Sequence, residues 1–350
     1  MTQTILATGA AGFIGSNFVR LVHQCTDYQI VIVDALTYAG NLANISDLLA
    51  SKRLTFIKGD IGDQELVLDL FTKYDVGVVV HFAAESHVDR SILEPRCFIK
   101  TNIEGTFNLL EAARVQWSAA DKHLFLHVSS DEVFGSLNPE ESPFDQRSRY
   151  QPSSPYAASK AASDHLVRAW HRTYDLPVVI TNCSNNYGPW QFPEKLIPLA
   201  ILNALEGREI PIYGDGMNLR DWIHVEDHCK ALLAVLQKGM IGDTYLVSAQ
   251  VECTNLEIVH MICDAVDRFS GQSPGTSRRL VKFVADRLGH DRRYAIDASA
   301  TRQKLNWMPS HRIEASLRDL VQWYVDHKTW ADEIRSGEYM TYYERQYASK

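Results

Sequence analysis

The sequence predicts an α/β fold in which a doubly wound parallel sheet is joined to a smaller, mixed α/β lobe. Through the first half of the chain, short runs rich in Val, Ile and Leu alternate with stretches of helical spacing, which predicts parallel strands connected by helices. The runs show little polar alternation, as expected when helices cover both faces of a sheet. After about Ser184, turn formers and short, irregularly spaced elements follow, and they predict a second lobe that closes over the sheet.

The predicted strands are residues 4–8, 30–34, 54–58, 76–82, 124–129 and 178–183. Helical spacing predicts helices over residues 13–23 and 156–174, the second of which ends before Leu176-Pro177. We therefore assign residues 1–184 to the sheet domain and residues 185–350 mainly to the smaller lobe. A helix at 225–236 and a strand at 244–247 are expected to return to the first domain, in a segment near 225–248.

Composition excludes several classes of function. The 350 residues carry a net charge of −8, so no basic field attracts nucleic acid or an anionic membrane. No apolar run reaches the roughly 20 residues that span a bilayer, and no signal-type segment opens the chain. The six cysteines are scattered without a C-x-x-C pair, which argues against a disulfide framework or a zinc site and favours free thiols in the cytoplasm. We expect no bound metal.

A glycine-rich turn follows the first predicted strand. Such a turn lets backbone N–H groups approach a pyrophosphate at the positive end of the next helix. The spacing is G-x-x-G-x-x-G, and a tight strand-to-helix turn without a ligand is the alternative explanation. The residues of the turn are Gly9, Ala10, Ala11, Gly12, Phe13, Ile14 and Gly15.

Acidic residues after the next two strands extend the prediction to a dinucleotide. Asp34 closes the second strand, where a carboxylate accepts hydrogen bonds from an adenosine ribose, and no Arg or Lys adjoins it. Because a lone carboxylate repels a 2′-phosphate, NAD is favoured over NADP, and residues 1–184 are predicted to form a Rossmann-type NAD-binding domain. Asp60, after the third strand, either reaches the adenine amino group or caps a turn. We also expect Ile61 and Ala83 to line the cofactor.

A candidate catalytic pair follows on a predicted helix. Tyr156 and Lys160 form a Y-x-x-x-K pair, and residues four apart share one helix face. An ammonium near a phenol favours the phenolate, so we expect the tyrosine pKa to fall toward neutrality and the phenolate to take a proton from a substrate hydroxyl. Ser130, after the fifth strand, is expected to orient the same oxygen. A pair of surface residues without a catalytic role is the alternative, and the glycine-rich turn upstream together with the serine at the strand end disfavours it.

Two adjacent carboxylates, Asp131 and Glu132, come directly after Ser130. They are predicted to lie at the carboxyl end of a parallel strand, where such sheets bind ligands. Simple oxidation requires neither of them, but an elimination requires both a base for a carbon-bound proton and an acid for a leaving hydroxyl. A pair whose pKa values are pushed apart can divide these roles. A solvated loop acid or a helix cap is the alternative.

Longer runs stand out at residues 36–41 (LTYAGN), 81–91 (HFAAESHVDRS), 129–135 (SSDEVFG), 155–164 (PYAASKAASD), 182–198, 220–222 (RDW) and 290–294 (HDRRY). In these runs the chain resembles the dTDP-glucose 4,6-dehydratases, a family of nucleotide-sugar dehydratases among the extended short-chain dehydrogenases/reductases. The resemblance extends from the N-terminus to about residue 300. The family usually has threonine in place of Ser130, tyrosine in place of Phe134 and Trp190, serine in place of Ala157 and proline in place of Leu288, and none of these differences removes an acid or a base.

The resemblance implies a reaction and a substrate. Tyr156 would deprotonate the C4 hydroxyl of dTDP-glucose as hydride passes to NAD, Glu132 would remove the C5 proton, and Asp131 would protonate the C6 hydroxyl as it leaves. The hydride would then return to C6. The resemblance also implies a homodimer built from helices such as 104–117 and 156–174, although the same apolar stripes are equally consistent with the core of one chain.

The resemblance places a further set of residues around the nucleotide sugar. Taken singly, an arginine is more often a surface residue and an asparagine a turn former, so these assignments depend on the family. A uracil nucleotide is not excluded, because one methyl group contributes only about 1–3 kcal/mol of discrimination. The residues are Asn185, Glu194, Lys195, Tyr213, Arg220, Asn255, Arg287 and His290.

Two other functions remain open from the sequence. A nucleotide-sugar 4-epimerase would share the glycines, Tyr156 and Lys160, but it would not require Asp131 and Glu132. A non-enzymatic protein that binds NAD on the same fold would have no need to keep all of these side chains. The pathway fed by the product is not encoded in any of these motifs.

Overall fold

The computed structural model describes residues 3–118 and 122–335. Its largest element is a seven-stranded sheet in the order β10-β6-β5-β4-β1-β2-β3, with every neighbouring pair parallel. The predicted α/β fold with a doubly wound, Rossmann-like sheet is confirmed. The strands are β1 (Thr4–Thr8), β2 (Gln29–Asp34), β3 (Leu54–Lys58), β4 (Val76–His81), β5 (Leu124–Ser130), β6 (Val178–Cys183) and β10 (Thr244–Val247).

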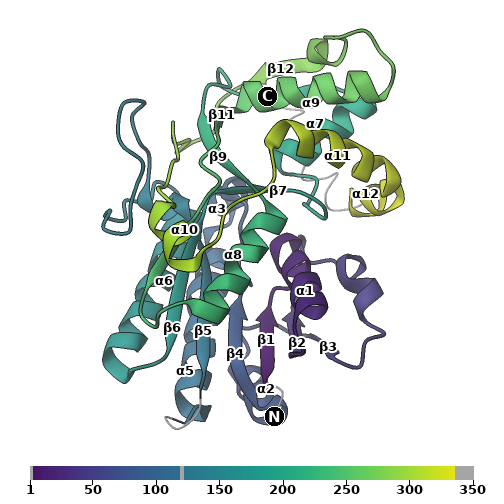
Figure 1. Cartoon of the computed structure of the whole chain (residues 1–350). Helices are drawn as coiled ribbons and strands as arrows, with labels where there is room; N and C mark the ends of the chain where they lie inside the picture. The colour runs from purple at the N-terminus through teal and green to yellow at the C-terminus, as the bar shows by residue number, and fades with distance from the viewer. Residues whose placement is uncertain (1–2, 119–121, 336–350) are drawn as a thin grey trace.

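Helices cover both faces of this sheet. Alternate residues of β4 show why: Val78 and Val80 pack into a core with α1 and α8, whereas Val79 packs into a second core with α2, α5 and α6. Figure 1 shows α1 and α8 lying across the front of the strands. The covering helices are α1 (Phe13–Cys25), α8 (Val225–Lys238), α2 (Gln64–Tyr74), α5 (Thr106–Gln116) and α6 (Pro155–Tyr174).

A smaller lobe lies beyond the carboxyl ends of these strands, at the top of Figure 1. It contains two small sheets and a helical core of its own, in which Trp222 is buried. Its elements are β7 (Asn185–Tyr187), α7 (Leu196–Leu205), β8 (Ile210–Tyr213), β9 (Leu219–His224), β11 (Glu252–Thr254), α9 (Asn255–Phe269), η4 (Ser277–Leu280), β12 (Val281–Val284), α11 (Ile313–Asp326) and α12 (Lys328–Ile334).

The chain passes between the lobes more than once. Strand β10 lies at the edge of the large sheet, with Thr244 opposite Ile180 of β6, and α10 (Ser299–Leu305) packs on α8 and β10. Near the end of the described chain, Trp330 Nε1 donates to Asn44 Oδ1 at 2.8 Å. The division of the chain at residue 184 into two domains stays a prediction.

The remaining elements are short and lie mainly near the carboxyl edge of the sheet. The predicted helix at 104–117 begins as a π-helix, η2 (Ile99–Gly105), which continues into α5. Among the described residues, no helix is both long enough and apolar enough to cross a membrane. The short elements are η1 (Leu42–Leu48), α3 (Val88–Leu93), α4 (Pro95–Phe98), η2 and η3 (Asp131–Phe134).

Candidate active site

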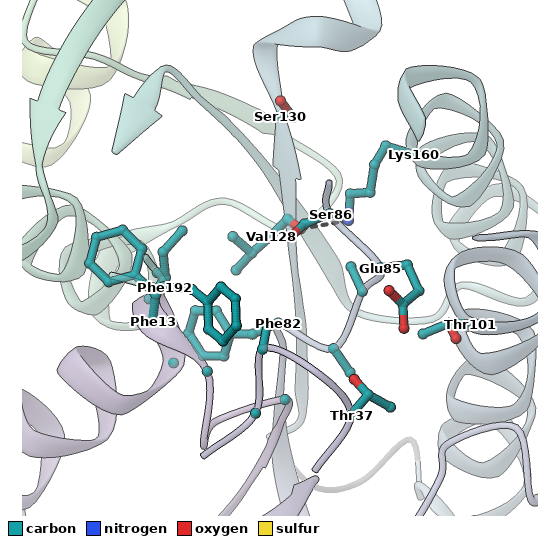
Figure 2. A pocket seen from close by; sticks show the side chains of 18 of the residues that line it. Phe13, Thr37, Phe82, Glu85, Ser86, Thr101, Val128, Ser130, Lys160 and Phe192 are labelled. Carbon is teal, nitrogen blue, oxygen red and sulfur yellow. Dashed lines mark hydrogen bonds between the residues drawn. The ribbon is translucent and has the colours of Figure 1, made fainter. Parts of the chain in front are cut away.

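A cavity of about 320 Å³ lies at the carboxyl ends of the central strands, between the two lobes. Figure 2 shows Phe13, Phe82 and Phe192 gathered on one side of it, with Glu85 and Thr101 on the other. Most of the predicted site residues line this one cavity. They are Gly9, Gly12, Phe13, Ile14, Gly15, Asp34, Asp60, Ile61, Ala83, Ser130, Asp131, Glu132, Tyr156, Lys160, Asn185, Glu194 and Lys195.

The glycine turn admits no larger side chain. Gly9 has a φ of +68°, and a Cβ there would lie 2.5 Å from the Cα of Ala83. A Cβ on Gly15 would lie 2.6 Å from the Cα of Ala10. Gly12 is the N-cap of α1, whose first turn carries no acidic residue and receives no side-chain cap. The turn therefore presents free backbone donors and a positive helix end, which are the features that a pyrophosphate requires.

The two acids expected at the cofactor differ in their surroundings. Asp34 is buried, and its two oxygens accept hydrogen bonds from the N–H groups of Ala11 (2.9 Å) and Leu36 (2.8 Å). These bonds orient the carboxylate and leave it further lone pairs for a ribose. Asp60 accepts from Gly62 N at 2.8 Å, so it caps a turn while it also lines the cavity. Together, the uncapped helix and the acid at the end of β2 fit NAD.

Tyr156 and Lys160, the predicted catalytic pair, lie one turn apart on α6, and both line the cavity. Lys160 Nζ donates to the carbonyl oxygen of Val128 at 2.9 Å, the contact dashed in Figure 2. Burial raises the pKa of Tyr156 well above its usual value and the charge of Glu132 raises it further, whereas a hydrogen bond with Ser130 lowers it. The expected fall of the Tyr156 pKa toward neutrality is therefore wrong for this arrangement, because burial outweighs the lysine, whose ammonium is directed at β5.

The two carboxylates begin η3, directly after β5. Asp131 is 2% exposed, and its Oδ2 has no hydrogen-bond partner among the described residues. Burial raises its pKa well above the usual value, and the charge of Glu132 adds to the rise. Burial also raises the pKa of Glu132, but three cations oppose the rise: Arg287, Arg220 and Lys195. The pKa of Glu132 is therefore raised less than that of Asp131, so Asp131 holds its proton more strongly of the two.

Of the residues expected at the nucleotide sugar, three line the cavity. Asn185 Oδ1 is buried without a hydrogen-bond partner in the described part of the chain, so it is available to a substrate donor. Glu194 is buried, with His87 Nε2 at 3.8 Å and Arg90 Nε at 3.5 Å. Lys195 donates to the Ser86 carbonyl at 3.2 Å.

Four others form a group in the smaller lobe, outside the cavity lining. The Tyr213 hydroxyl donates to Asp89 Oδ2 at 2.9 Å, and Arg287 Nη1 lies 3.6 Å from Asp89 Oδ1. The ring of His290 lies 6.1 Å from that of Tyr213. Arg220 is buried and donates to the Asp291 carbonyl at 2.9 Å. The structure therefore joins Tyr213 and Arg287 through Asp89 and places the His290 ring beside Tyr213. Arg220 lies near Glu132, as its effect on the pKa of that carboxylate shows.

Asn255 stands apart from these groups. It begins α9, and its backbone N–H donates to the Asn218 carbonyl at 3.1 Å. Nothing in the geometry of the described residues brings its side chain to the cavity, so its role in substrate binding stays a prediction.

Sequence comparison identifies the family. A protein-family profile described as GDP-mannose 4,6 dehydratase matches residues 6–320. A dTDP-glucose 4,6-dehydratase of Neisseria meningitidis serogroup B is 50% identical over 345 residues, which cover 96% of this chain and 97% of that protein. The chain belongs to the dTDP-glucose 4,6-dehydratase family. The resemblance inferred from the sequence runs is confirmed.

Solved structures agree with this family. The dTDP-glucose 4,6-dehydratase DesIV of Streptomyces venezuelae, solved with NAD and TYD bound, superposes with a TM-score of 0.87 at 42% identity, covering 95% of this chain and 100% of that one. A UDP-glucose 4-epimerase of Thermotoga maritima reaches a TM-score of 0.81 at 26% identity, covering 93% and 99%. Because an epimerase shares the fold, the fold alone does not distinguish dehydration from epimerisation. The distinction has to come from the acidic residues of the site, Asp131 and Glu132.

Two residues that the sequence did not single out complete this dehydratase-family site. Asp89 is buried and connects Tyr213 with Arg287. The Tyr294 hydroxyl lies 3.5 Å from Glu132 Oε2 and donates to Asp291 Oδ2 at 2.6 Å. Both lie inside runs that resemble the family, so their position in a motif was the one available signal.

A group of potential metal ligands lies away from the cavity. Atoms of His224, Glu226 and His311 come within 4.8 Å of one another. The two imidazole rings stack at 3.9 Å with 17° between their planes, so a single ion cannot lie in the plane of both. His311 Nδ1 is also 3.0 Å from Asp227 Oδ2. In this arrangement the two rings stack on each other, and His311 also contacts the carboxylates of Glu226 and Asp227.

Proposed function

We propose that this chain is a dTDP-glucose 4,6-dehydratase, a hydro-lyase that converts dTDP-glucose to dTDP-4-dehydro-6-deoxy-glucose and water. The observation that carries the proposal is the convergence of Tyr156, Asp131 and Glu132 on one cavity. Relatives of about 50% identity that bear this name support it, as does the structure of DesIV with NAD and TYD bound.

Tyr156 removes the proton of the C4 hydroxyl in this proposal. Ser130 shares a hydrogen bond with the phenol and orients the same oxygen, and Lys160 supplies positive charge from the next turn of α6. NAD, when bound, supplies the hydride acceptor and a cationic nicotinamide that favours the phenolate. The Gly9–Gly15 turn would supply backbone N–H donors to NAD, and the carboxylates of Asp34 and Asp60 would accept hydrogen bonds from it.

The elimination is divided between the two carboxyl groups. Ionised Glu132, held by neighbouring cations, removes the C5 proton that a C4 ketone makes acidic. Protonated Asp131 delivers its proton to the departing C6 hydroxyl, which leaves as water. An acid and a base are thus present together, as elimination requires. A 4-epimerase has no use for this pair.

The decisive experiment is Glu132→Gln. The variant keeps the size of the side chain and loses the base, so C4 oxidation proceeds while elimination slows by about 10²–10⁴-fold. We expect NADH absorbance to accumulate to about one equivalent per site with dTDP-glucose, without a dehydrated product in mass spectrometry. Full product formation by the variant would overturn the assignment of the base.

The substrate is tested with the unchanged protein. Product from dTDP-glucose should be lighter by one water. A product of unchanged mass with the galacto configuration would identify a 4-epimerase, and turnover of UDP-glucose alone would identify a UDP-hexose dehydratase. Absence of any turnover, with NAD bound, would support a non-enzymatic role.

We further propose a homodimer that forms through α5 and α6. Phe107 of α5 is exposed and meets Trp170 of α6 edge-on, with ring centroids 5.7 Å apart. Exposed Tyr174 extends this apolar surface along α6. Light scattering should report two chains for the unchanged protein and for the exposed control Met308→Glu, and one chain for Phe107→Glu. A dimeric Phe107→Glu protein would refute this interface. A cytoplasmic location stays a prediction.

A further inference from the structure

A buried carboxylate shares a face of α6 with the residues proposed to start the reaction. Tyr156, Lys160 and Asp164 follow one another at intervals of four, which places them along one side of the helix. Asp164 is fully buried, and so is its partner on the sheet, His127 of β5. His127 Nε2 lies 3.1 Å from Asp164 Oδ1. Neither residue lines the cavity, and the proposed chemistry uses neither of them.

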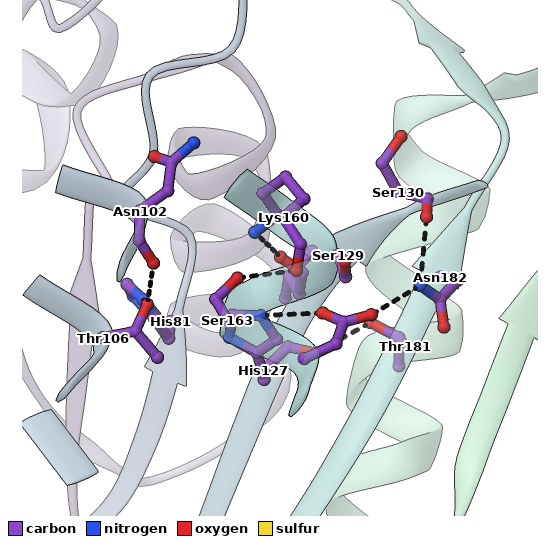
Figure 3. A network of polar contacts seen from close by, with 12 residues as sticks. His81, Asn102, Thr106, His127, Ser129, Ser130, Lys160, Ser163, Thr181 and Asn182 are labelled. Atoms are coloured by element: carbon purple, nitrogen blue, oxygen red, sulfur yellow. Dashed lines mark hydrogen bonds and ion pairs between the residues drawn. The ribbon is translucent and has the colours of Figure 1, made fainter. Parts of the chain in front are cut away.

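Donors from three further segments converge on this carboxylate. Besides His127, the Tyr150 hydroxyl donates to Asp164 Oδ2 at 2.7 Å, and Asn182 Nδ2 donates to it at 3.1 Å. Asn182 of β6 also donates to the Ser130 carbonyl at 3.0 Å, and Figure 3 shows this contact beside Lys160 and His127. Asp164 therefore connects the catalytic helix to the strand end that carries Ser130.

The charge of Asp164 is balanced by Lys160. Burial raises the pKa of Asp164, but the contact with His127 and the charge of Lys160 are among the effects that bring it to about 2, so it is ionised. Burial and the charge of Lys160 lower the pKa of His127 to about 4, so the ring is neutral where its Nε2 faces Asp164 Oδ1. Burial lowers the pKa of Lys160, and the charge of Asp164 is the largest of the effects that oppose this lowering.

Three other titratable groups around this pair, those of His81, Cys183 and Tyr150, are neutral near pH 7. Burial lowers the pKa of His81 on β4 well below its usual value. Burial raises the pKa of Cys183 on β6 to about 12 and raises that of Tyr150 as well. Arg168, one turn beyond Asp164, is directed to the Tyr150 hydroxyl at 2.7 Å. The carboxylate of Asp164 is thus the negative charge that opposes the lysine ammonium from within its own helix.

We infer that Asp164 is a positioning residue of this active site, whose charge keeps Lys160 protonated and whose hydrogen bonds hold α6 against the end of β5. A buried ammonium that lacks a counter-charge releases its proton, because desolvation penalises the charged form. The inference rests on the proposed function, in which the lysine must be a cation to favour the Tyr156 phenolate.

The test compares three variants in single turnover of NAD-loaded protein with dTDP-glucose, followed by NADH appearance against pH. Asp164→Asn removes the charge, so the rate should fall at a lower pH than in the unchanged enzyme, by about one pH unit or more. Asp164→Glu and His127→Asn disturb the same contacts but keep the negative charge at residue 164. They should slow the reaction without changing the pH at which the rate falls on the basic side of the profile, its basic limb. An unmoved limb in Asp164→Asn would show that the residue is merely structural and would overturn the inference.

A second measurement covers the case in which Asp164→Asn does not fold. In the unchanged protein labelled with ¹⁵N-lysine, the Lys160 signal, assigned by its loss in Lys160→Met, should be that of an ammonium at pH 8. An amine signal at that pH would contradict the inference. This titration requires no turnover, so it separates a failure of the inference from a failure of the proposed function, which would abolish NADH formation in the unchanged enzyme.

Discussion

Glu194 offers a prediction whose size follows from the structure. Its carboxyl group is almost fully buried between the strand ends and α7, and burial raises its pKa from 4.5 to about 7, against the opposing charges of Lys195 and Arg90. At 1.36 kcal/mol per pKa unit, that difference disfavours the ionised form in the folded protein by about 3 kcal/mol. A group with a raised acid pKa destabilises the fold once it is ionised, so stability is lost as pH rises from about 4.5 to about 7.

The variant Glu194→Gln removes this loss, because an amide of the same shape stays neutral. We expect the variant and the unchanged protein to differ little at pH 4.5, and the variant to be more stable by about 2–3 kcal/mol at pH 8.5. Unfolding in guanidinium chloride across this pH range measures the difference. The exposed Glu140→Gln is the matched control, and its effect should not depend on pH. A Glu194→Gln effect that is equally large at both pH values would refute the raised pKa.

Three further predictions concern the cofactor and the acids. Gly9→Ala should weaken NAD binding by at least about tenfold in calorimetry, because the added Cβ would lie 2.5 Å from the Ala83 backbone. The control is Gly207→Ala, at a glycine with a similar φ but open space around it, and this variant should bind NAD normally. Equal losses of affinity in both variants would count against the close approach at Gly9. Tyr156→Phe should slow NADH appearance in single turnover by about 10²–10⁴-fold, and an unchanged rate would remove the phenol from its role. Arg287→Gln should raise the pKa of Glu132, since Arg287 is the strongest charge that lowers it. The acidic limb of the pH–rate profile for product formation should therefore move to higher pH. Arg287→Lys should restore the profile, and a profile unchanged in both variants would contradict this coupling.

Much of the sheet could be predicted from local sequence. The strands at 4–8, 54–58, 178–183 and 244–247 have the predicted bounds, because short apolar runs between helices can be recognised without knowing which strand pairs with which. The prediction of a helix at 104–117 was less accurate. It begins as a π-helix in which buried Asn102 bonds to Glu85 and to Ser159 of α6, and such long-range contacts leave no periodic signal.

In the candidate site, too, local motifs could be predicted from the sequence, whereas long-range contacts could not. The glycine turn, Asp34, the Y-x-x-x-K pair and the adjacent carboxylates were predictable, since each is a short motif whose geometry follows from one turn or one helix. Asp89, which joins Tyr213 to Arg287, was not, because it lies more than a hundred positions before either partner in the sequence.

The amino-acid order alone determined which functional groups are present and on which strand ends and helix faces they stand. Only the tertiary structure decided their protonation: which carboxyl of Asp131 and Glu132 keeps its proton, why the Tyr156 phenol is not acidified by Lys160 alone, and what balances the lysine. Protonation depends on burial and on charges brought close by folding, and neither can be read from the local amino-acid sequence.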